Sequence, residues 1–151
     1  MSLTDLSSVL WRTRELLELL LFKLEEEQLL LAAGRSRWLA HATREVEVAR
    51  AAYAQSVAIE LGLHPEASLG DIANAAPEPW SELLHQHRKA FVALTSEISG
   101  LAATNRDLLT AGQRAARETM MVIAGNVETY GRKGQTVSEG ARRAQLVDEA
   151  I

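Results

Sequence analysis

The stretch that decides the fold runs from Trp80 to Leu109 and reads WSELLHQHRKAFVALTSEISGLAATNRDLL. Within it, a mostly apolar seam advances by steps that alternate between three and four residues, at Leu84, His87, Phe91, Leu94, Ile98, Leu101, Asn105 and Leu108. This spacing keeps one face of an α-helix against a neighbouring helix, as in a coiled coil. No proline follows Pro79, so we expect one helix over about 80–129, roughly 75 Å long at 1.5 Å per residue.

The composition is typical of a soluble helical protein. Of the 151 residues, 47% are apolar and 24% are charged, while aromatic residues make up only 5%. Leucine and alanine dominate, which favours helix over strand. The net charge is −4 and the basic residues are scattered, so the sequence does not indicate nucleic-acid binding. There are no cysteines, which removes disulfides and thiolate metal sites.

Two further helices precede the long one. We expect the first to begin at Thr4 or Asp5, to span about 5–33 and to end before Gly34, with Ser36 capping the second helix over about 36–62. The turn between them is short, so the pair should form an antiparallel hairpin. A proline-containing connector over 63–79 follows, in which Ser68 can cap a short helix that holds Leu69 and Ile72. The predicted fold is all-α, an elongated antiparallel helical bundle or coiled coil of three to four helices with a long third helix.

The seam weakens after Leu108, where Gly112 falls on it. An apolar face reappears, slightly rotated, at Met120, Ile123, Val127 and Tyr130. Either the helix bends or breaks near Gly112, or its second half packs on something different, and the sequence leaves both alternatives open. A straight helix would extend well beyond the first two, which are each about 40 Å long, and its apolar surface would then need a partner.

Residues 1–130 therefore form the expected bundle domain. We expect 131–151 to be a flexible tail, in which Ser138 can cap a short amphipathic helix. The N-terminus has no cationic start, and the longest apolar run, Leu19 to Phe22, is far too short to span a bilayer. The sequence thus predicts a cytoplasmic protein without membrane insertion.

No catalytic constellation stands out. The acidic run from Glu25 to Glu27 looks like a carboxylate cluster, but consecutive helical residues point about 100° apart, so we interpret it as a solvated face. His85 and His87 are two residues apart and make a poor metal pair, and we expect His87 to be packed or to face a partner. A helical metal enzyme needs Glu-x-x-His pairs on facing helices, and one such spacing, Glu82 to His85, is not enough. We expect no enzyme, no metal and no cofactor.

Asn105 is the one polar residue in the middle of the seam. A buried asparagine can fix the register of packed helices, and we favour that interpretation over a hydrogen bond to a bound partner. Met120 and Met121 lie near the second apolar face, and methionine adapts to varied partners. A groove for an amphipathic helix and an ordinary core are about equally supported for that face.

Three stretches of the chain have a layout that can be compared with known families. They are a Leu- and Glu-rich first helix that ends in Leu29-Leu-Leu-Ala-Ala-Gly34, the asparagine-centred stretch Thr104-Asn105-Arg106-Asp107-Leu108-Leu109, and the C-terminal segment Thr129-Tyr130-Gly131 with Gly134 beyond. This layout resembles the FlgN family of flagellar export chaperones. The asparagine followed by the Tyr-Gly close is the more specific part. Family members often carry a second asparagine just before the position of Asn105, and this chain has Ala102-Ala103-Thr104 there.

The resemblance implies a cytoplasmic, non-enzymatic chaperone for hook–filament junction proteins. Such a chaperone would keep their helical ends soluble and deliver them to the flagellar type III export apparatus. Carried over to this chain, the client-binding residues would be Asn105, Leu108, Met120, Ile123, Val127, Tyr130, Leu146 and Val147. The alternative is a structural coiled-coil homodimer or scaffold subunit without a secreted client, which the wide apolar surface of the first helix fits equally well.

Overall fold

The computed structural model describes residues 2–133, which contain four helices and, within that range, no strand. The helices are α1 (Leu3–Ala32), α2 (Ser36–Leu63), α3 (Leu69–Ala75) and α4 (Trp80–Lys133). The chain divides into two units, of which the first ends at Leu108 and the second begins at Leu109. The predicted all-α helical bundle is confirmed. The predicted tail helix, with Ser138, lies outside the described residues.

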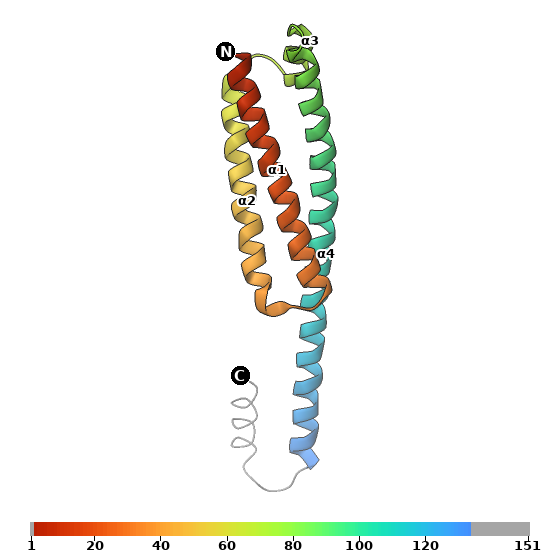
Figure 1. Cartoon of the computed structure of the whole chain (residues 1–151). Coiled ribbons are helices and arrows are strands. Elements are labelled where there is room, and N and C mark those ends of the chain that lie inside the picture. Colours follow the sequence, from red (N-terminus) through yellow and green to blue (C-terminus); the bar gives the residue numbers. More distant parts are fainter. Residues whose placement is uncertain (1, 134–151) are drawn as a thin grey trace. The chain divides into compact units, whose positions relative to one another are not determined.

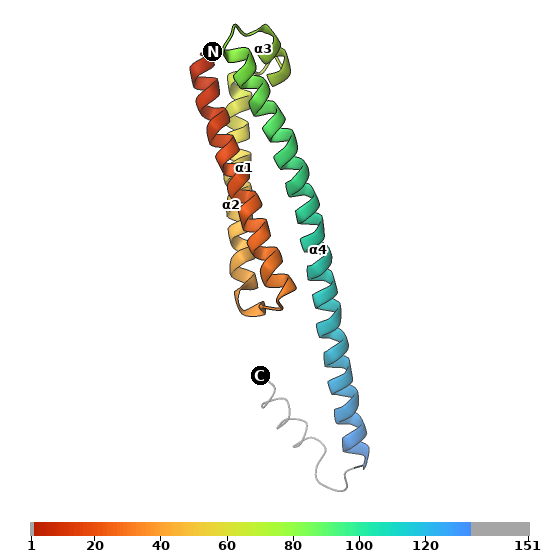
Figure 2. The ribbon, with the colours of Figure 1, turned by 45° about the vertical axis from the view of Figure 1, so that its right-hand side comes forward.

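An antiparallel hairpin of α1 and α2 forms the centre of the first unit (Figures 1 and 2). Gly34 lies in the turn with a φ of 66°, in the left-handed region that favours glycine. The N–H of Arg35 donates to the carbonyl of Leu30 at 2.9 Å, and the N–H of Gly34 donates to the carbonyl of Leu31 at 3.2 Å. This pair of bonds is a Schellman motif, which satisfies the last carbonyls of a helix. The predicted stop at Gly34 is therefore confirmed.

Two predicted helix starts were wrong in detail. The cap of α1 is Ser2 rather than Thr4 or Asp5, because the Ser2 hydroxyl accepts a hydrogen bond from the Thr4 N–H at 3.2 Å. Ser36 does not cap α2 but is its first helical residue, and Arg35 at the cap position offers no side-chain bond. The tight turn explains the second difference, since its backbone bonds already fix the chain up to Arg35.

The short helix α3 closes one end of the first unit. Its predicted cap is confirmed: Ser68 accepts from the Asp71 N–H at 3.1 Å, and the Asp71 carboxylate accepts from the Ser68 N–H at 3.3 Å. This reciprocal capping box stabilises a helix too short to persist alone. One side of α3 completes a core cluster with no solvent exposure, made of Leu6, Leu10, Ala73 and Leu84.

The first-unit part of α4 runs alongside the hairpin (Figures 1 and 2). Every position of the predicted seam from Leu84 to Leu108 is buried or half-buried. A second core cluster joins the three long helices and contains Leu17, Leu20, Leu24, Val46, Ala49 and Ile98. Each large aliphatic side chain buried in this way contributes on the order of 2 kcal/mol to folding.

The helix α4 continues through Gly112 to Lys133, so it does not break at that glycine. Apart from its chain neighbours and the backbone of its own helix, no heavy atom of the described residues lies within 4 Å of the position that a Cβ would take at Gly112. A helical glycine costs about 1 kcal/mol relative to alanine, but the uninterrupted backbone hydrogen bonds carry the helix past it. Of the two alternatives left open by the sequence, the structure excludes the break near Gly112.

We predict that Leu17→Ala lowers the free energy of unfolding by about 2 to 5 kcal/mol, because it leaves a cavity where the three helices meet. The measurement is urea denaturation followed by circular dichroism. Val92→Ala, at an exposed position of α4, serves as the control and should change the free energy by less than about 0.5 kcal/mol. Equal losses for the two variants would contradict the assigned core.

Candidate functional site

The described part of the second unit carries an apolar stripe on α4. Met120, Ile123 and Tyr130 are 66%, 50% and 71% exposed, and Val127 is half-buried. The steps of three, four and three residues place the four side chains on one face of the helix. The sequence predicted these positions, and the structure leaves three of them open to solvent. We call this surface the α4 stripe.

The surroundings of the α4 stripe add to its apolar character. Met121 and Val122 are also exposed, at 74% and 62%. The hydroxyls of Thr119 and Thr129 donate back to the carbonyls of Ala115 and Gly125, each at 2.9 Å, so they are satisfied within the helix. A cluster of large apolar side chains that is exposed to solvent commonly marks a binding surface. The exposed Met120 and Met121 suit such a surface, because methionine side chains adapt to different partners.

Asn105 lies in the interior of the first unit and is 2% exposed. Its Nδ2 donates to the carbonyl of Leu24 at 2.9 Å and to Oε1 of Glu27 at 3.0 Å. The other carboxylate oxygen of Glu27 accepts from the Thr43 hydroxyl at 3.0 Å. One buried layer thus joins α1, α2 and α4, and this arrangement supports the interpretation of Asn105 as a register-setting residue.

Glu27 was wrongly assigned to a solvated face, since it is only 4% exposed. A signal was available, because Glu27 continues the stripe of Leu17, Leu20 and Leu24 at steps of three and four residues. A carboxylate in such a position needs donors, since an unpaired buried charge is costly. The donors come from two other helices, which no pattern within α1 reveals.

His87 is packed, with 1% of its surface exposed. Its ring meets Trp11 edge-on at a centroid distance of 4.6 Å, and the Phe91 ring lies 6.0 Å away. Neither ring nitrogen has a hydrogen-bond partner among residues 2–133. Burial lowers the pKa of His87, and the nearby charge of Arg14 lowers it further, so the ring is held neutral.

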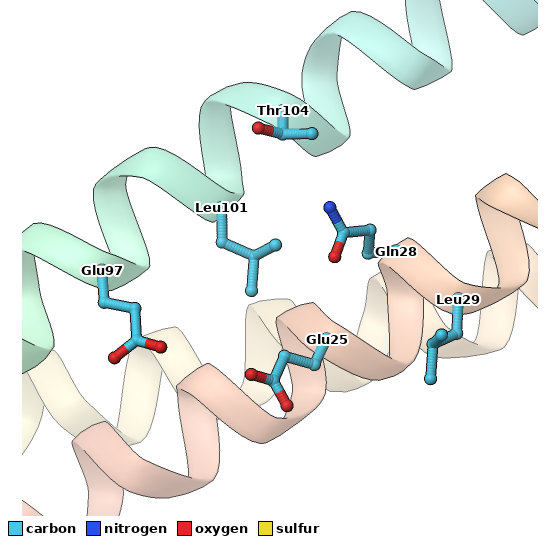
Figure 3. Close-up of a pocket in the computed structure, with 6 residues that line it drawn as sticks. All are labelled: Glu25, Gln28, Leu29, Glu97, Leu101 and Thr104. Atoms are coloured by element: carbon cyan, nitrogen blue, oxygen red, sulfur yellow. The ribbon is translucent and has the colours of Figure 1, made fainter.

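A groove of about 410 Å³ lies between α1 and α4 in the first unit (Figure 3). It is lined by Glu25, Gln28, Leu29, Glu97, Leu101 and Thr104. Figure 3 shows Leu101 pointing from α4 toward α1, with Glu97 on its own helix and Glu25 on α1 opposite it. This groove could not be predicted from the sequence, because its two walls, Glu25 to Leu29 and Glu97 to Thr104, lie far apart in the chain.

The remaining predicted site residues divide in two. Leu108 is half-buried at the end of the first unit. Leu146 and Val147 lie outside the described residues. Between residues 2 and 133, no three metal-ligating side chains gather, and no helix is long and apolar enough to cross a membrane.

Comparison with known proteins gave one family match. Residues 1–138 match the family model described as FlgN protein. No curated protein and no solved structure matches the chain. The match covers both the bundle of the first unit and the α4 stripe.

We predict that Asn105→Leu lowers the free energy of unfolding by about 1 to 3 kcal/mol, because it removes a donor from the buried Glu27 carboxylate. Adding Glu27→Leu should recover much of this loss, since the stranded charge is then gone. Urea denaturation of the two single variants and the double variant gives the coupling. Losses that simply add would contradict the assigned contact.

We predict that His87→Leu flattens the pH dependence of stability. The folded-state pKa of His87 is lowered, so the stability due to the neutral ring is fully present above the ordinary value of about 6.5. It is lost as the pH falls below that value toward the lowered pKa, because the unfolded chain binds the proton first. Urea denaturation at a series of pH values compares the two proteins, and parallel curves below pH ~6.5 would contradict this assignment.

Proposed function

The chain belongs to the FlgN family of flagellar export chaperones, and from this premise we propose that it binds the helical ends of hook–filament junction proteins through the α4 stripe. In this proposal the chaperone acts in the cytoplasm, keeps its clients soluble and delivers them to the flagellar type III export apparatus. No catalytic step is part of it.

The observation that carries the proposal is the exposure of the α4 stripe. Met120, Ile123 and Tyr130 offer at least half of their surface to solvent on a regular helix. An amphipathic client helix pairs with such a face through anchors at steps of three and four residues. Covering apolar surface on both partners supplies the free energy of association without nucleotide or covalent chemistry.

The proposed surface includes Leu146 and Val147, which would extend it beyond the described residues. Leu108, half-buried where the first unit ends, would mark its other end. Asn105 is left out, because the residue is only 2% exposed and its Nδ2 already donates two hydrogen bonds inside the bundle. The client therefore has a proposed surface that is separate from the core of the first unit.

A structural homodimer is the second candidate, and one observation favours it. The α1–α2 hairpin has its own groove of about 390 Å³, in which Leu19 and Val48 are 43% and 70% exposed. Two copies could cover these side chains by pairing their hairpins. A mass that stays monomeric across a wide concentration range in light scattering would rule this candidate out.

We predict that Ile123→Asp combined with Val127→Asp abolishes client binding while helical content stays near normal. The two carboxylates would have to be desolvated against the apolar face of the client, which costs several kcal/mol. Isothermal calorimetry with the hook–filament junction proteins of the same organism measures the affinity, and circular dichroism measures the helix.

The matched control is Val48→Asp combined with Val92→Asp, which adds the same charge at exposed valines of α2 and α4 in the first unit. The control should bind its client as the unaltered chain does. Equal loss in both variants would contradict the α4 stripe as the client surface. Unfolding of the first variant alone would show that Ile123 and Val127 belong to a core.

A further inference from the structure

The groove between α1 and α4 has features that the proposed client surface does not use. All of its lining residues, from Glu25 to Thr104, belong to the first unit, whereas the α4 stripe belongs to the second. Its volume of about 410 Å³ is in the range of sites that hold several side chains of a bound partner. The charge and the apolar surface of its lining residues indicate which kind of partner fits it.

The walls of the groove are acidic. Glu25 on α1 and Glu97 on α4 are both exposed, and neither has an ion pair within residues 2–133. No lysine, arginine or histidine lines the groove. Two carboxylates that face one space without a cation create a local negative potential, which favours a positively charged occupant.

The groove also has apolar surface beside the carboxylates, at Leu29 and Leu101 (Figure 3). Leu29 is 70% exposed, and Leu101 is half-buried because its other side packs on the core cluster of Leu17, Leu20 and Leu24. An arginine or lysine side chain matches this combination, since its aliphatic stem covers apolar surface while its head reaches a carboxylate.

We propose that the groove lined by Glu25, Leu29, Glu97 and Leu101 docks a basic amphipathic helix of a partner protein. Two neighbouring helices offer a groove into which the ridge of a third helix fits. The apolar side of the docked helix lies on Leu29 and Leu101, and its basic residues lie beside the two glutamates. Gln28 adds an amide that has no hydrogen bond to residues 2–133.

A second copy of this chain is the poorer occupant. The chain carries a net charge of −4, so two copies repel each other where one presents an acidic groove. A nucleic acid is excluded on the same ground, because its phosphates would face Glu25 and Glu97. The occupant is therefore a protein segment in which arginine or lysine flanks an apolar stripe.

The test uses the full chain and two synthetic helical peptides, labelled for fluorescence anisotropy. Both peptides carry the same leucine stripe, flanked by arginine in one and by glutamate in the other. We expect the arginine peptide to bind at least tenfold more tightly than the glutamate peptide. Its affinity should fall as salt rises from about 0.05 M to about 0.5 M, because the carboxylates are exposed to screening ions.

Substitutions then locate the site. Glu25→Lys combined with Glu97→Lys should weaken the arginine peptide by roughly tenfold or more, since both attractions become repulsions. The control, Glu15→Lys combined with Glu47→Lys, changes the net charge by the same amount at exposed positions outside the groove. Leu29→Ser should also weaken binding, whereas Val92→Ser, at a similarly exposed position, should not.

Three outcomes would overturn the proposal. They are equal binding of the two peptides, equal loss in the groove variant and its charge-matched control, and self-association of the chain that disappears in the groove variant. Ile123→Asp combined with Val127→Asp should leave the arginine peptide bound with unchanged affinity. Failure of the client experiment and failure of this one are therefore distinguishable.

Discussion

A buried carboxylate holds the first unit of this protein in register. Glu27 on α1 accepts hydrogen bonds from Asn105 on α4 and from Thr43 on α2, all within one layer of the bundle. The leucines above it would pack nearly as well after a shift of one helical turn, because apolar contacts have little directional preference. A carboxylate out of reach of its donors would instead be stranded in the interior, at a cost of several kcal/mol. The contact therefore selects one alignment, and the position of the α1–α4 groove follows from it.

The long helix α4 has apolar side chains at steps of three and four residues in both units, but their surroundings differ. Up to Leu108 its seam is covered by the rest of the first unit. Leu84 and Ile98 are buried there, each in one of the two core clusters. From Leu109 to Tyr130, within the described residues, the apolar side chains are exposed or at most half-buried. Because α4 continues through Gly112 without interruption, one part of it can contribute to the core of the first unit while the next part offers an exposed face for binding. This is the arrangement expected of a chaperone that must fold before its client arrives.

The two candidate surfaces differ in chemistry, and each proposal therefore names a different kind of partner. The α4 stripe is apolar and rich in methionine, which favours adaptable pairing with an amphipathic helix. The groove between α1 and α4 places two carboxylates, neither of which forms an ion pair within residues 2–133, beside leucine. This combination favours a basic helix, and its binding is expected to weaken as salt rises.

The sequence by itself determined the helices, the hairpin turn and the seam, because these depend on local properties: residue propensity, the left-handed freedom of Gly34 and steps of three and four residues from Leu84 to Leu108. The same spacing also placed Met120, Ile123 and Tyr130 on one face of the helix, but it left open whether that face is a core or a groove for a partner. The folded chain alone shows that Glu27 accepts from Asn105 and Thr43, that His87 is packed against Trp11, and that Glu25 and Glu97 share a groove. The physical reason is that burial and pairing of a polar side chain depend on residues far away in the chain. Glu27 and Asn105 are 78 positions apart, and no pattern within either helix records that they meet.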